Sequence, residues 1–586
     1  MAHEVHRGFA GLWGAPFFYP ETHALALSDH LLGPGIEAAA LMALGANAIA
    51  AYNLLLASSF VLCGWSACYV LGRSGLSRAA SFLGGCMFAF SPFRWDELSH
   101  LPVLLMQWIP LALWSFDRLL AAATWRRAAP FLLFYLLCVS GGTYLGYMIH
   151  VPLLALLLNR LPQVVRQARG PAGGRAIAVL GAAAGVAAAA LAFLFVPYWT
   201  VSRRLHLRWG TEVLQAWGTS ALSFLTPARA ALYSGLWPPA LYRAENALFP
   251  GWIPSALLVA GLLAWWRERH RVQGQAAPLS GGRRLALGLL LATAAAGYLT
   301  AELYTWAYRF PALEWLVPGH QYRVPLLLLA GGLALWSVLF RRWHGRWPVR
   351  WDGEPSWPRG LLLAGLFAAV LSLPVVFAGA RKLLPGLAAM RVPSRLAVFI
   401  SFTLMWFAAA SLDRILGRLR SRRRRMAAVG LATVLLAVEL MPRAFAWTEL
   451  PDEPAFPPAY AWIGMQPEVK VILELPLGDL DIGNPDLVNI SYMYFGTRHW
   501  KPLVNGYGAH TPPEHEELRQ LCCWPLPEAP ALEVLRRWGV THVLIHAGDL
   551  SGWQHRALDR WQGEQVYRDG GDDRVYRLPG AAAAGK

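Results

Sequence analysis

Apolar runs of about 20 residues recur along most of this chain, and they constrain its fold more than any other feature. A helix needs about 20 consecutive apolar residues to cross the hydrocarbon core of a bilayer. Only 15% of the 586 residues are charged, whereas a soluble chain carries about a quarter. The sequence therefore predicts an all-α polytopic membrane bundle of about twelve transmembrane helices, followed by a soluble α/β domain.

Two alternating kinds of loop join the predicted spans. One kind is short and rich in arginine, from Arg73 and Arg78 to the run 422–425. Because Lys and Arg accumulate on the cytoplasmic side, these loops explain the formal net charge of +17 without a nucleic-acid partner. The longer loops hold most of the carboxylates and are predicted to lie outside, with both termini. The predicted spans are residues 47–72, 79–93, 101–117, 129–141, 143–159, 176–197, 251–266, 285–303, 324–340, 360–379, 396–413 and 426–441.

The composition divides the chain into four predicted regions. These are an extracytoplasmic loop with an interfacial helix (1–46), a transmembrane domain with its largest outer loop at 198–250 (47–446), a soluble extracytoplasmic α/β domain (447–580) and a disordered tail (581–586). Within the soluble domain, strands are predicted at 469–475 and 541–546, an amphipathic helix at 531–539 and a hairpin at 565–577.

The opening stretch 14–33 is aromatic, polar and interrupted by proline, so it cannot cross lipid. We expect it to form the floor of an active site at the outer membrane face, with Glu21, His23, Asp29 and His30 as its polar groups. Neither a signal peptide nor a leading span precedes it in this sequence. We therefore expect the natural gene to encode another helix upstream, or a separate small protein to supply one.

A second polar connection, residues 91–100, joins two predicted spans and carries Arg94, Asp96, Glu97 and His100. A carboxylate in such a loop can act as a general base or share a divalent cation with another loop. The alternative is an ordinary solvated loop in which His100 begins a helix.

Two further outer loops carry candidate substrate-binding groups. Loop 198–250 is rich in arginine and ends at Glu245; the turn before the span 396–413 carries Arg391 and Arg395. Guanidinium groups donate paired hydrogen bonds to phosphate oxyanions, so Arg391 and Arg395 could clamp a phosphate or diphosphate. Attraction to anionic lipid and snorkelling at the interface are the alternatives.

In the predicted soluble domain, His499, Trp500 and Asn505 combine aromatic faces with an amide, a combination that suits sugar stacking and hydroxyl recognition. Loop packing is the alternative explanation. The sequence contains none of the usual phosphate-loop, dinucleotide-fingerprint, zinc-protease or serine-elbow motifs of soluble enzymes.

Several of these segments resemble one group of bacterial membrane proteins, which are assigned to the GT-C superfamily of glycosyltransferases. The resemblance rests on PFFYPE, LALSDHLLG, AFSPFRWDELSHLPVL, ENALFPG, MRVPSRLAVF, ELPL and HWKPLVNGYG, and it extends over nearly the whole chain. The first helix and acidic loop motif that normally precede such a stretch in GT-C enzymes are not in this sequence.

The resemblance implies an enzyme of the bacterial inner membrane that transfers a sugar from a polyprenyl-phosphate donor to an extracytoplasmic glycan, lipid or protein. It also implies an outer-loop Asp or Glu base, sometimes with a divalent cation such as Mg²⁺ or Mn²⁺. By position, Asp29 and Asp96 are the nearest matches to those carboxylates and the candidate metal ligands, with Glu97 as a further catalytic candidate. Two alternatives stay open: a non-catalytic scaffold of envelope assembly, and a lipid-linked-sugar transporter, which the scarcity of ionisable groups within the spans disfavours.

Overall fold

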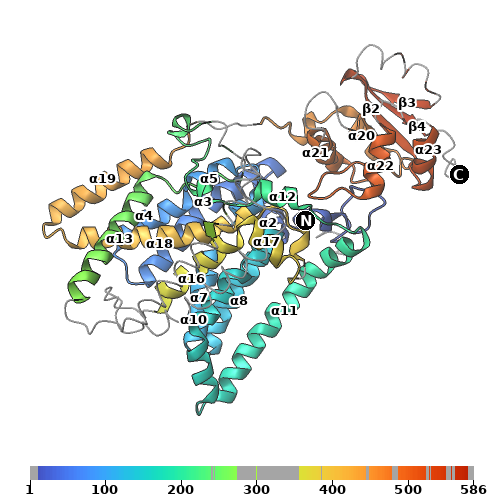
Figure 1. Cartoon of the computed structure of the whole chain (residues 1–586). Coiled ribbons are helices and arrows are strands. Elements are labelled where there is room, and N and C mark those ends of the chain that lie inside the picture. Colours follow the sequence, from blue (N-terminus) through green and yellow to red (C-terminus); the bar gives the residue numbers. More distant parts are fainter. Residues whose placement is uncertain are drawn as a thin grey trace. The chain divides into compact units, whose positions relative to one another are not determined.

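The computed structural model contains two compact units, and each is described by itself (Figure 1). We call residues Asn53–Ala192 and Arg208–Ala446 the helical unit, and residues Met1–Tyr52, Phe193–Leu207 and Trp447–Lys586 the sheet unit. The described residues are 11–238, 245–273, 356–384, 386–443, 448–477, 486–522, 529–549 and 563–578, with the single positions 242, 298, 299, 302, 527, 556, 558 and 561.

Apolar helices make up the helical unit, and two of them, α3 and α11, also contribute residues to the sheet unit. The helices are α3 (Ala48–Arg73), α4 (Arg78–Ala89), α5 (Pro92–Asp96), α6 (Leu101–Leu104), α7 (Ile109–Ala121), α8 (Trp125–Ser140), α9 (Thr143–Met148), α10 (His150–Arg169), α11 (Gly173–Arg204), α12 (Thr211–Trp217), α13 (Trp252–Gln273), α16 (Ser356–Leu371), α17 (Pro374–Ala380), α18 (Ala397–Gly417) and α19 (Arg422–Leu440).

The longer helices pack side by side in a continuous series. Helix α7 contacts α8 and α10, α10 contacts α16, and α16 contacts α18, which also meets α4 and α13 (Figure 1). Small residues allow the close approaches, since a Cβ added at Gly365 of α16 would lie only 2.8 Å from the Thr403 side chain of α18. Such contacts are typical of helices that associate in lipid, where no hydrophobic gain drives association.

Four described helices are long and apolar enough to cross a membrane, and a fifth if the pair α16 and α17, bent by 91°, counts as one span. The prediction of about twelve spans is therefore wrong for the described part of the chain. The four candidate spans are Ala48–Arg73, Thr143–Arg169, Gly173–Arg204 and Pro393–Gly417.

Two of the remaining predicted spans correspond to helices that are too short or too highly charged to qualify as membrane spans. Helix α4 has only 12 residues, a length of about 18 Å against a hydrocarbon core of about 30 Å. Helix α19 begins with four consecutive arginines. Of the two predicted spans 285–303 and 324–340, the second lies outside the described residues and the first does so for all but three positions.

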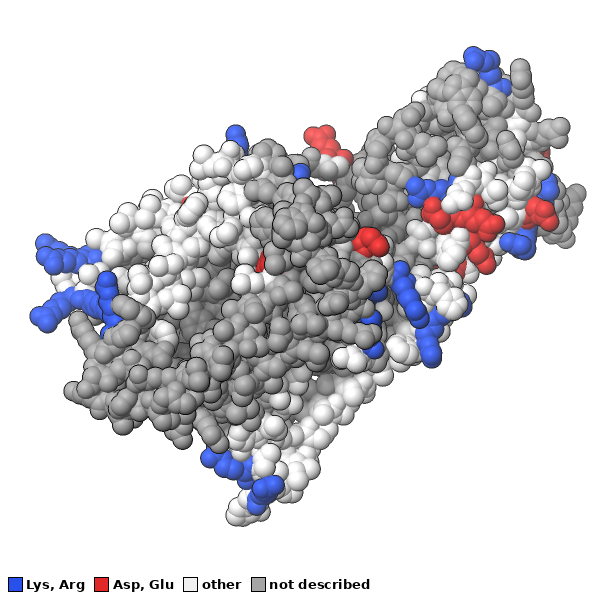
Figure 2. Space-filling view, viewed as in Figure 1, with Lys and Arg blue, Asp and Glu red and all other residues white. Residues whose placement is uncertain are grey.

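Basic side chains gather at helix ends, as a membrane-spanning chain requires. In Figure 2, Lys and Arg lie at the turn between α10 and α11 and at the start of α19. The exposed arginines at these two places are Arg166, Arg169, Arg175 and the run 422–425. The assignment of these ends to the cytoplasmic side stays a prediction.

The sheet unit is built on four strands in the order β1-β2-β4-β3. Strand β1 pairs with β2 in parallel, and β4 pairs antiparallel with both β2 and β3. The strands predicted at 469–475 and 541–546, the helix at 531–539 and the hairpin at 565–577 are all confirmed. The elements are α20 (Pro458–Met465), β1 (Ile472–Leu475), α21 (Asp486–Phe495), α22 (Pro513–Leu521), α23 (Ala529–Arg537), β2 (His542–His546), β3 (Glu564–Arg568) and β4 (Asp573–Arg577).

Helices cover both faces of this sheet, so strands β1 and β2 are buried throughout. Leu473 and Val543 pack with residues of α22 and α23 on one face, whereas Ile472 and Leu544 pack with residues of α20 and α21 on the other. Because successive side chains of a strand point to opposite faces, apolar runs such as HVLI of β2 fit this two-sided core.

The opening stretch 14–33 belongs to the sheet unit. The Leu503 N–H donates to Pro16 O (2.8 Å), and the Phe18 N–H donates to Asn505 O (3.0 Å), so residues 16–18 extend the pairing beyond β1. Phe18 is 2% exposed, and its ring lies edge-on to His515. The predicted interfacial helix forms as α2 (Leu32–Ala43). The predicted role of the stretch as an active-site floor stays a prediction.

Candidate functional site

The connection 91–105 of the helical unit is shaped by its prolines and anchored by Arg94. Pro92 and Pro102 begin the short helices α5 and α6, because proline at the first helical turn loses no hydrogen bond. Arg94 is fully buried and donates to Ala89 O (2.5 Å), Ser59 Oγ (3.1 Å) and Leu104 O (2.9 Å). The predicted substrate-binding group Arg94 thus ties this connection to the ends of its neighbouring helices.

Asp96 is also engaged by the protein. Its carboxylate accepts hydrogen bonds from the N–H groups of Arg229 (2.8 Å) and Ala230 (3.1 Å). The Tyr242 hydroxyl adds a third at 2.7 Å. The predicted base Asp96 therefore holds a distant loop in place, and its catalytic role stays a prediction.

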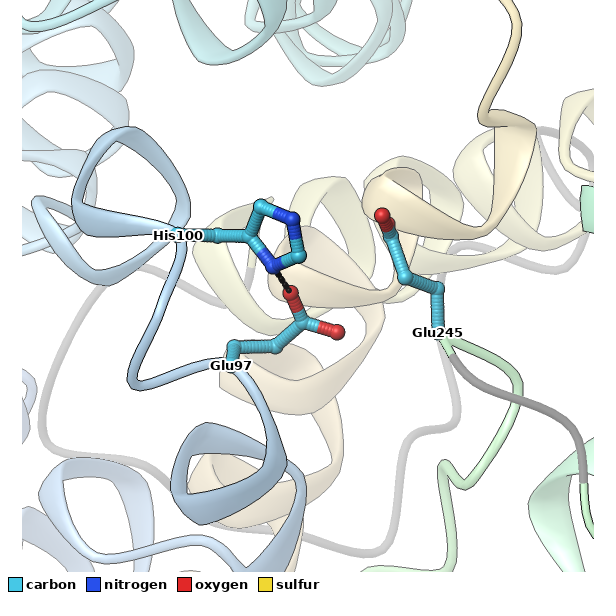
Figure 3. A group of neighbouring side chains, drawn as sticks. All are labelled: Glu97, His100 and Glu245. Carbon is cyan, nitrogen blue, oxygen red and sulfur yellow. Dashed lines mark ion pairs between the residues drawn. The ribbon is translucent and has the colours of Figure 1, made fainter. Parts of the chain in front are cut away.

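The next carboxylate along the chain, Glu97, meets His100 and Glu245. One ligand atom from each of the three lies within 4.8 Å of the others, the only such group among the described His, Cys, Asp and Glu residues. Figure 3 shows Glu97 and His100 on one connection and Glu245 on a separate segment, with the three side chains facing a common space. His100 Nδ1 lies 2.9 Å from Glu97 Oε2. The sequence predicted all three as site residues, but it did not predict that they lie close together.

Glu245 is positioned by its backbone and by Arg395. Its φ of 58° lies in the left-handed region, which costs a non-glycine residue about 1 kcal/mol or more. Arg395 donates to both carboxylate oxygens at 2.8 Å. The two side chains are 9% and 8% exposed, so a bidentate, nearly buried ion pair fixes Glu245 beside His100.

The pKa values of Glu97 and His100 are both raised from their ordinary values. Burial raises the pKa of the Glu97 carboxyl, and the charge of Glu245 adds to this, although His100 and Arg395 act in the opposite direction. The contact with Glu97 raises the pKa of His100, against the effect of burial. Two such groups in contact can share or pass a proton, as general acid–base catalysis requires.

The same three residues fit a divalent cation. Two carboxylates and one imidazole suit Mn²⁺ or Zn²⁺ better than Mg²⁺, which prefers oxygen ligands alone. Glu97 Oε2 is buried and makes no well-aligned hydrogen bond, despite its short contact with His100, so a lone pair stays available. The predicted metal candidates Asp29 and Asp96 are not among these three residues, and their role as metal ligands stays a prediction.

Tyr144, at the start of α9, holds both predicted phosphate-binding arginines. The Arg395 guanidinium lies 4.4 Å from the centre of its ring, and its hydroxyl accepts from the Arg391 N–H at 3.1 Å. The Arg391 guanidinium instead lies over Trp209, 5.1 Å from the ring centre. Sequence reasoning missed Tyr144 and Trp209, because neither stands in a motif and the contacts join segments far apart in the chain.

The predicted residues of the opening stretch lie in the sheet unit, where most have protein partners. Glu21 accepts hydrogen bonds from Arg204 and from the His23 N–H. His30 is 4% exposed, and its Nδ1 lies 3.3 Å from the Tyr198 hydroxyl. Asp29 lies just before α2.

The predicted sugar-binding residues of the sheet unit differ in what they offer. Asn505 is buried, and its amide bonds Glu474 O, Asn489 Oδ1 and the Glu474 N–H. His499 stacks on Tyr460, and burial lowers its pKa to about 4, with Lys501 contributing. Trp500, at 39% exposed, alone offers a large accessible face.

A second cluster of titratable groups, which the sequence did not indicate, lies buried in the sheet unit. His546 Nδ1 lies 2.9 Å from Asp573 Oδ1, and its Nε2 lies 3.1 Å from Glu474 Oε2. The Tyr460 hydroxyl donates to the same Glu474 oxygen at 2.5 Å, and Tyr492 stacks on the imidazole. The side chains of His546, Glu474 and Asp573 are only 10%, 0% and 11% exposed. This cluster therefore lacks an accessible ligand position of the kind that His100 offers.

Comparison of the chain with known protein families and with curated proteins finds no match.

Proposed function

We propose that this chain is a membrane glycosyltransferase of the GT-C type, which transfers a sugar from a polyprenyl-phosphate-linked donor to an extracytoplasmic glycan, lipid or protein. The observation that carries the proposal is the meeting of Glu97, His100, Glu245 and Arg395 in a unit of apolar helices. That group combines a proton acceptor, a cation site and a guanidinium. The sequence resemblance described above supports the same reaction class and a location in a bacterial inner membrane.

In this proposal Glu97, with His100 in contact, accepts the proton of the acceptor hydroxyl. The hydroxyl oxygen forms the new bond to the anomeric carbon, while the bond from that carbon to the donor phosphate oxygen breaks. The leaving phosphate takes the electron pair, and Arg395 lies close enough to the site to stabilise the growing negative charge. A divalent cation held by Glu97, His100 and Glu245 would supply further charge stabilisation at the leaving oxygen.

The test is a transfer assay on the full chain in nanodiscs, with donor lipids extracted from bacterial membranes and release of polyprenyl phosphate followed by mass spectrometry. We expect Glu97→Gln to lower release at least about 100-fold, the usual contribution of a general base. Glu212→Gln is the matched control, because Glu212 is an exposed carboxylate of the same unit.

Equal activity of Glu97→Gln and wild type would refute the assignment of the base. Absence of release by the wild-type chain with every donor pool would refute the transferase and favour the non-catalytic scaffold.

A further inference from the structure

Two arginines of the helical unit contact Trp209, and a third, Arg208, precedes it in the chain. The Arg381 guanidinium donates to Trp209 O at 2.8 Å, and Arg391 lies over the indole ring. Arg208 is the preceding residue and is exposed. The indole Nε1–H donates to Ala389 O at 3.1 Å, so Trp209 joins its own segment to the turn that carries Arg391. We call Arg208, Arg381, Arg391 and Trp209 the Trp209 cluster.

The charges of this cluster are not balanced by carboxylates. Arg395 pairs with Glu245 and Arg160 pairs with Asp117. By contrast, none of the three arginines of the Trp209 cluster forms an ion pair with an Asp or Glu of the described residues. Burial lowers the pKa of Arg381, and the nearby charge of Arg208 lowers it further. Guanidinium groups are thus held close enough to repel one another.

Such an arrangement is unfavourable unless an anion offsets it. Guanidinium groups bind phosphate oxygens through paired, charge-assisted hydrogen bonds, and repulsion between cations near a protein surface is worth a few kcal/mol at close range. Arg391 donates only its backbone N–H in the described structure, to Tyr144, which leaves its guanidinium donors available to a ligand.

We propose that the Trp209 cluster is a phosphate-binding site, distinct from the Glu97–His100–Glu245 group, for a ligand that carries at least two negative charges. Three guanidinium groups without a paired carboxylate match a diphosphate or a phosphate monoester better than a singly charged diester. Tyr144 connects the two sites, since it contacts Arg391 by its hydroxyl and Arg395 by its ring. The proposal rests on the proposed function where it identifies this anion with the polyprenyl phosphate that transfer releases, which is a phosphate monoester.

The sequence predicted that Arg391 and Arg395 act as a pair. The structure separates them, because Arg395 is neutralised by Glu245 whereas Arg391 joins two arginines that come from other segments. Arg208 and Arg381 therefore join Arg391 as candidate phosphate-binding residues. Arg395 belongs instead with Glu245, beside Glu97 and His100.

The test measures anion binding by the full chain in phosphatidylcholine nanodiscs. One arm titrates inorganic pyrophosphate by calorimetry; the other adds polyprenyl diphosphate or polyprenyl phosphate to the nanodiscs and counts bound lipid by native mass spectrometry. We expect Arg391→Gln and Arg208→Gln each to weaken binding at least about tenfold. Arg208→Gln guards against misfolding, because Arg208 is exposed, and Arg267→Gln, an exposed arginine of α13, serves as the matched control.

Binding in the lipid arm alone identifies a lipid headgroup, and binding of pyrophosphate alone identifies a soluble phosphate compound; both support the site. No binding in either arm, or equal binding by wild type, Arg391→Gln and Arg208→Gln, overturns it. Glu97→Gln should retain binding and lose transfer. Binding without any transfer by the wild-type chain would thus refute the proposed function and leave this inference standing.

Discussion

The two units of this protein contain the same three groups, two carboxylates and one histidine, arranged in opposite ways. In the sheet unit, His546 lies between Glu474 and Asp573 with both ring nitrogens engaged, and its side chain is 10% exposed. In the helical unit, the His100 side chain is 44% exposed, and only Nδ1 contacts a carboxylate. The buried cluster is closed and stabilises the fold, whereas the half-open group can accept a ligand or a proton.

The pKa values follow this difference. Although burial lowers it, hydrogen bonds to Asp573 and Glu474 raise the pKa of His546 to about 10, so the imidazole stays charged between two carboxylates at neutral pH. His100 has one carboxylate contact that raises its pKa. A partly exposed imidazole in contact with one carboxylate suits proton transfer; a buried imidazolium held between two carboxylates suits a structural role.

The largest expected effect is the loss of the buried imidazolium. His546→Ala leaves Glu474 and Asp573 buried beside each other without a cation, and removal of one partner of a buried charged group costs about 3–5 kcal/mol. His100→Ala should cost under about 1 kcal/mol, because a half-exposed ion pair contributes little. Denaturant unfolding of the two variants measures both. Equal losses would contradict the contrast between the two clusters.

The second prediction concerns the cation site. Mn²⁺ should bind the full chain, and His100→Ala should lower its affinity at least tenfold, since a ligand is lost from a site of only three protein donors. His546→Gln is the matched control and should leave Mn²⁺ binding unchanged. Electron paramagnetic resonance of free Mn²⁺ gives both affinities. If His546→Gln abolished Mn²⁺ binding and His100→Ala did not, the Mn²⁺ site would lie in the sheet unit, and the prediction would be wrong.

The third prediction is the pH dependence of the sheet unit. The folded pKa of His546, about 10, lies above its ordinary value of about 6.5, so the folded state binds the proton more tightly than the unfolded state. Its stabilisation is complete below about pH 6.5 and is lost as the pH rises through about 10. Burial also raises the pKa of Glu474, which acts in the same direction.

Amide hydrogen exchange of β2 and β4, corrected for the pH dependence of the intrinsic exchange rate, should therefore show protection falling between pH 7 and pH 10. His546→Gln should remove most of this dependence. Protection that stays constant over the same interval would show that His546 is neutral in the folded state.

Features that depend on residues close together in the chain could be predicted from the sequence, whereas contacts between distant segments could not. The strand and helix boundaries of the sheet unit depend on local periodicity, and they were predicted to within a few residues, as at 541–546 against His542–His546. The candidate site was predicted as a set of residues, because Glu97, His100, Glu245 and Arg395 stand in polar loops between apolar segments.

The partners of those residues could not be predicted in the same way. Nothing in the local sequence distinguishes Asp96, which three distant donors engage, from its neighbour Glu97, which faces the site. For the described residues, the span count was too high because hydropathy alone does not show where a helix ends before it reaches membrane length, as at Ala89, where α4 ends after 12 residues.

The smallest expected effect concerns the residue that connects the two proposed sites of the helical unit. Tyr144→Phe removes the hydroxyl that accepts from the Arg391 N–H and keeps the ring beneath Arg395, so it should cost about 1 kcal/mol of stability, the value of one hydrogen bond. It should also weaken pyrophosphate binding more than transfer, because only the Arg391 side is disturbed. Tyr69→Phe, a change at an exposed tyrosine of the same unit, is the control. If Tyr144→Phe lowered transfer while pyrophosphate binding stayed intact, Tyr144 would act on the Glu97–His100–Glu245 group instead, and the connection between the sites would have to run through Arg395.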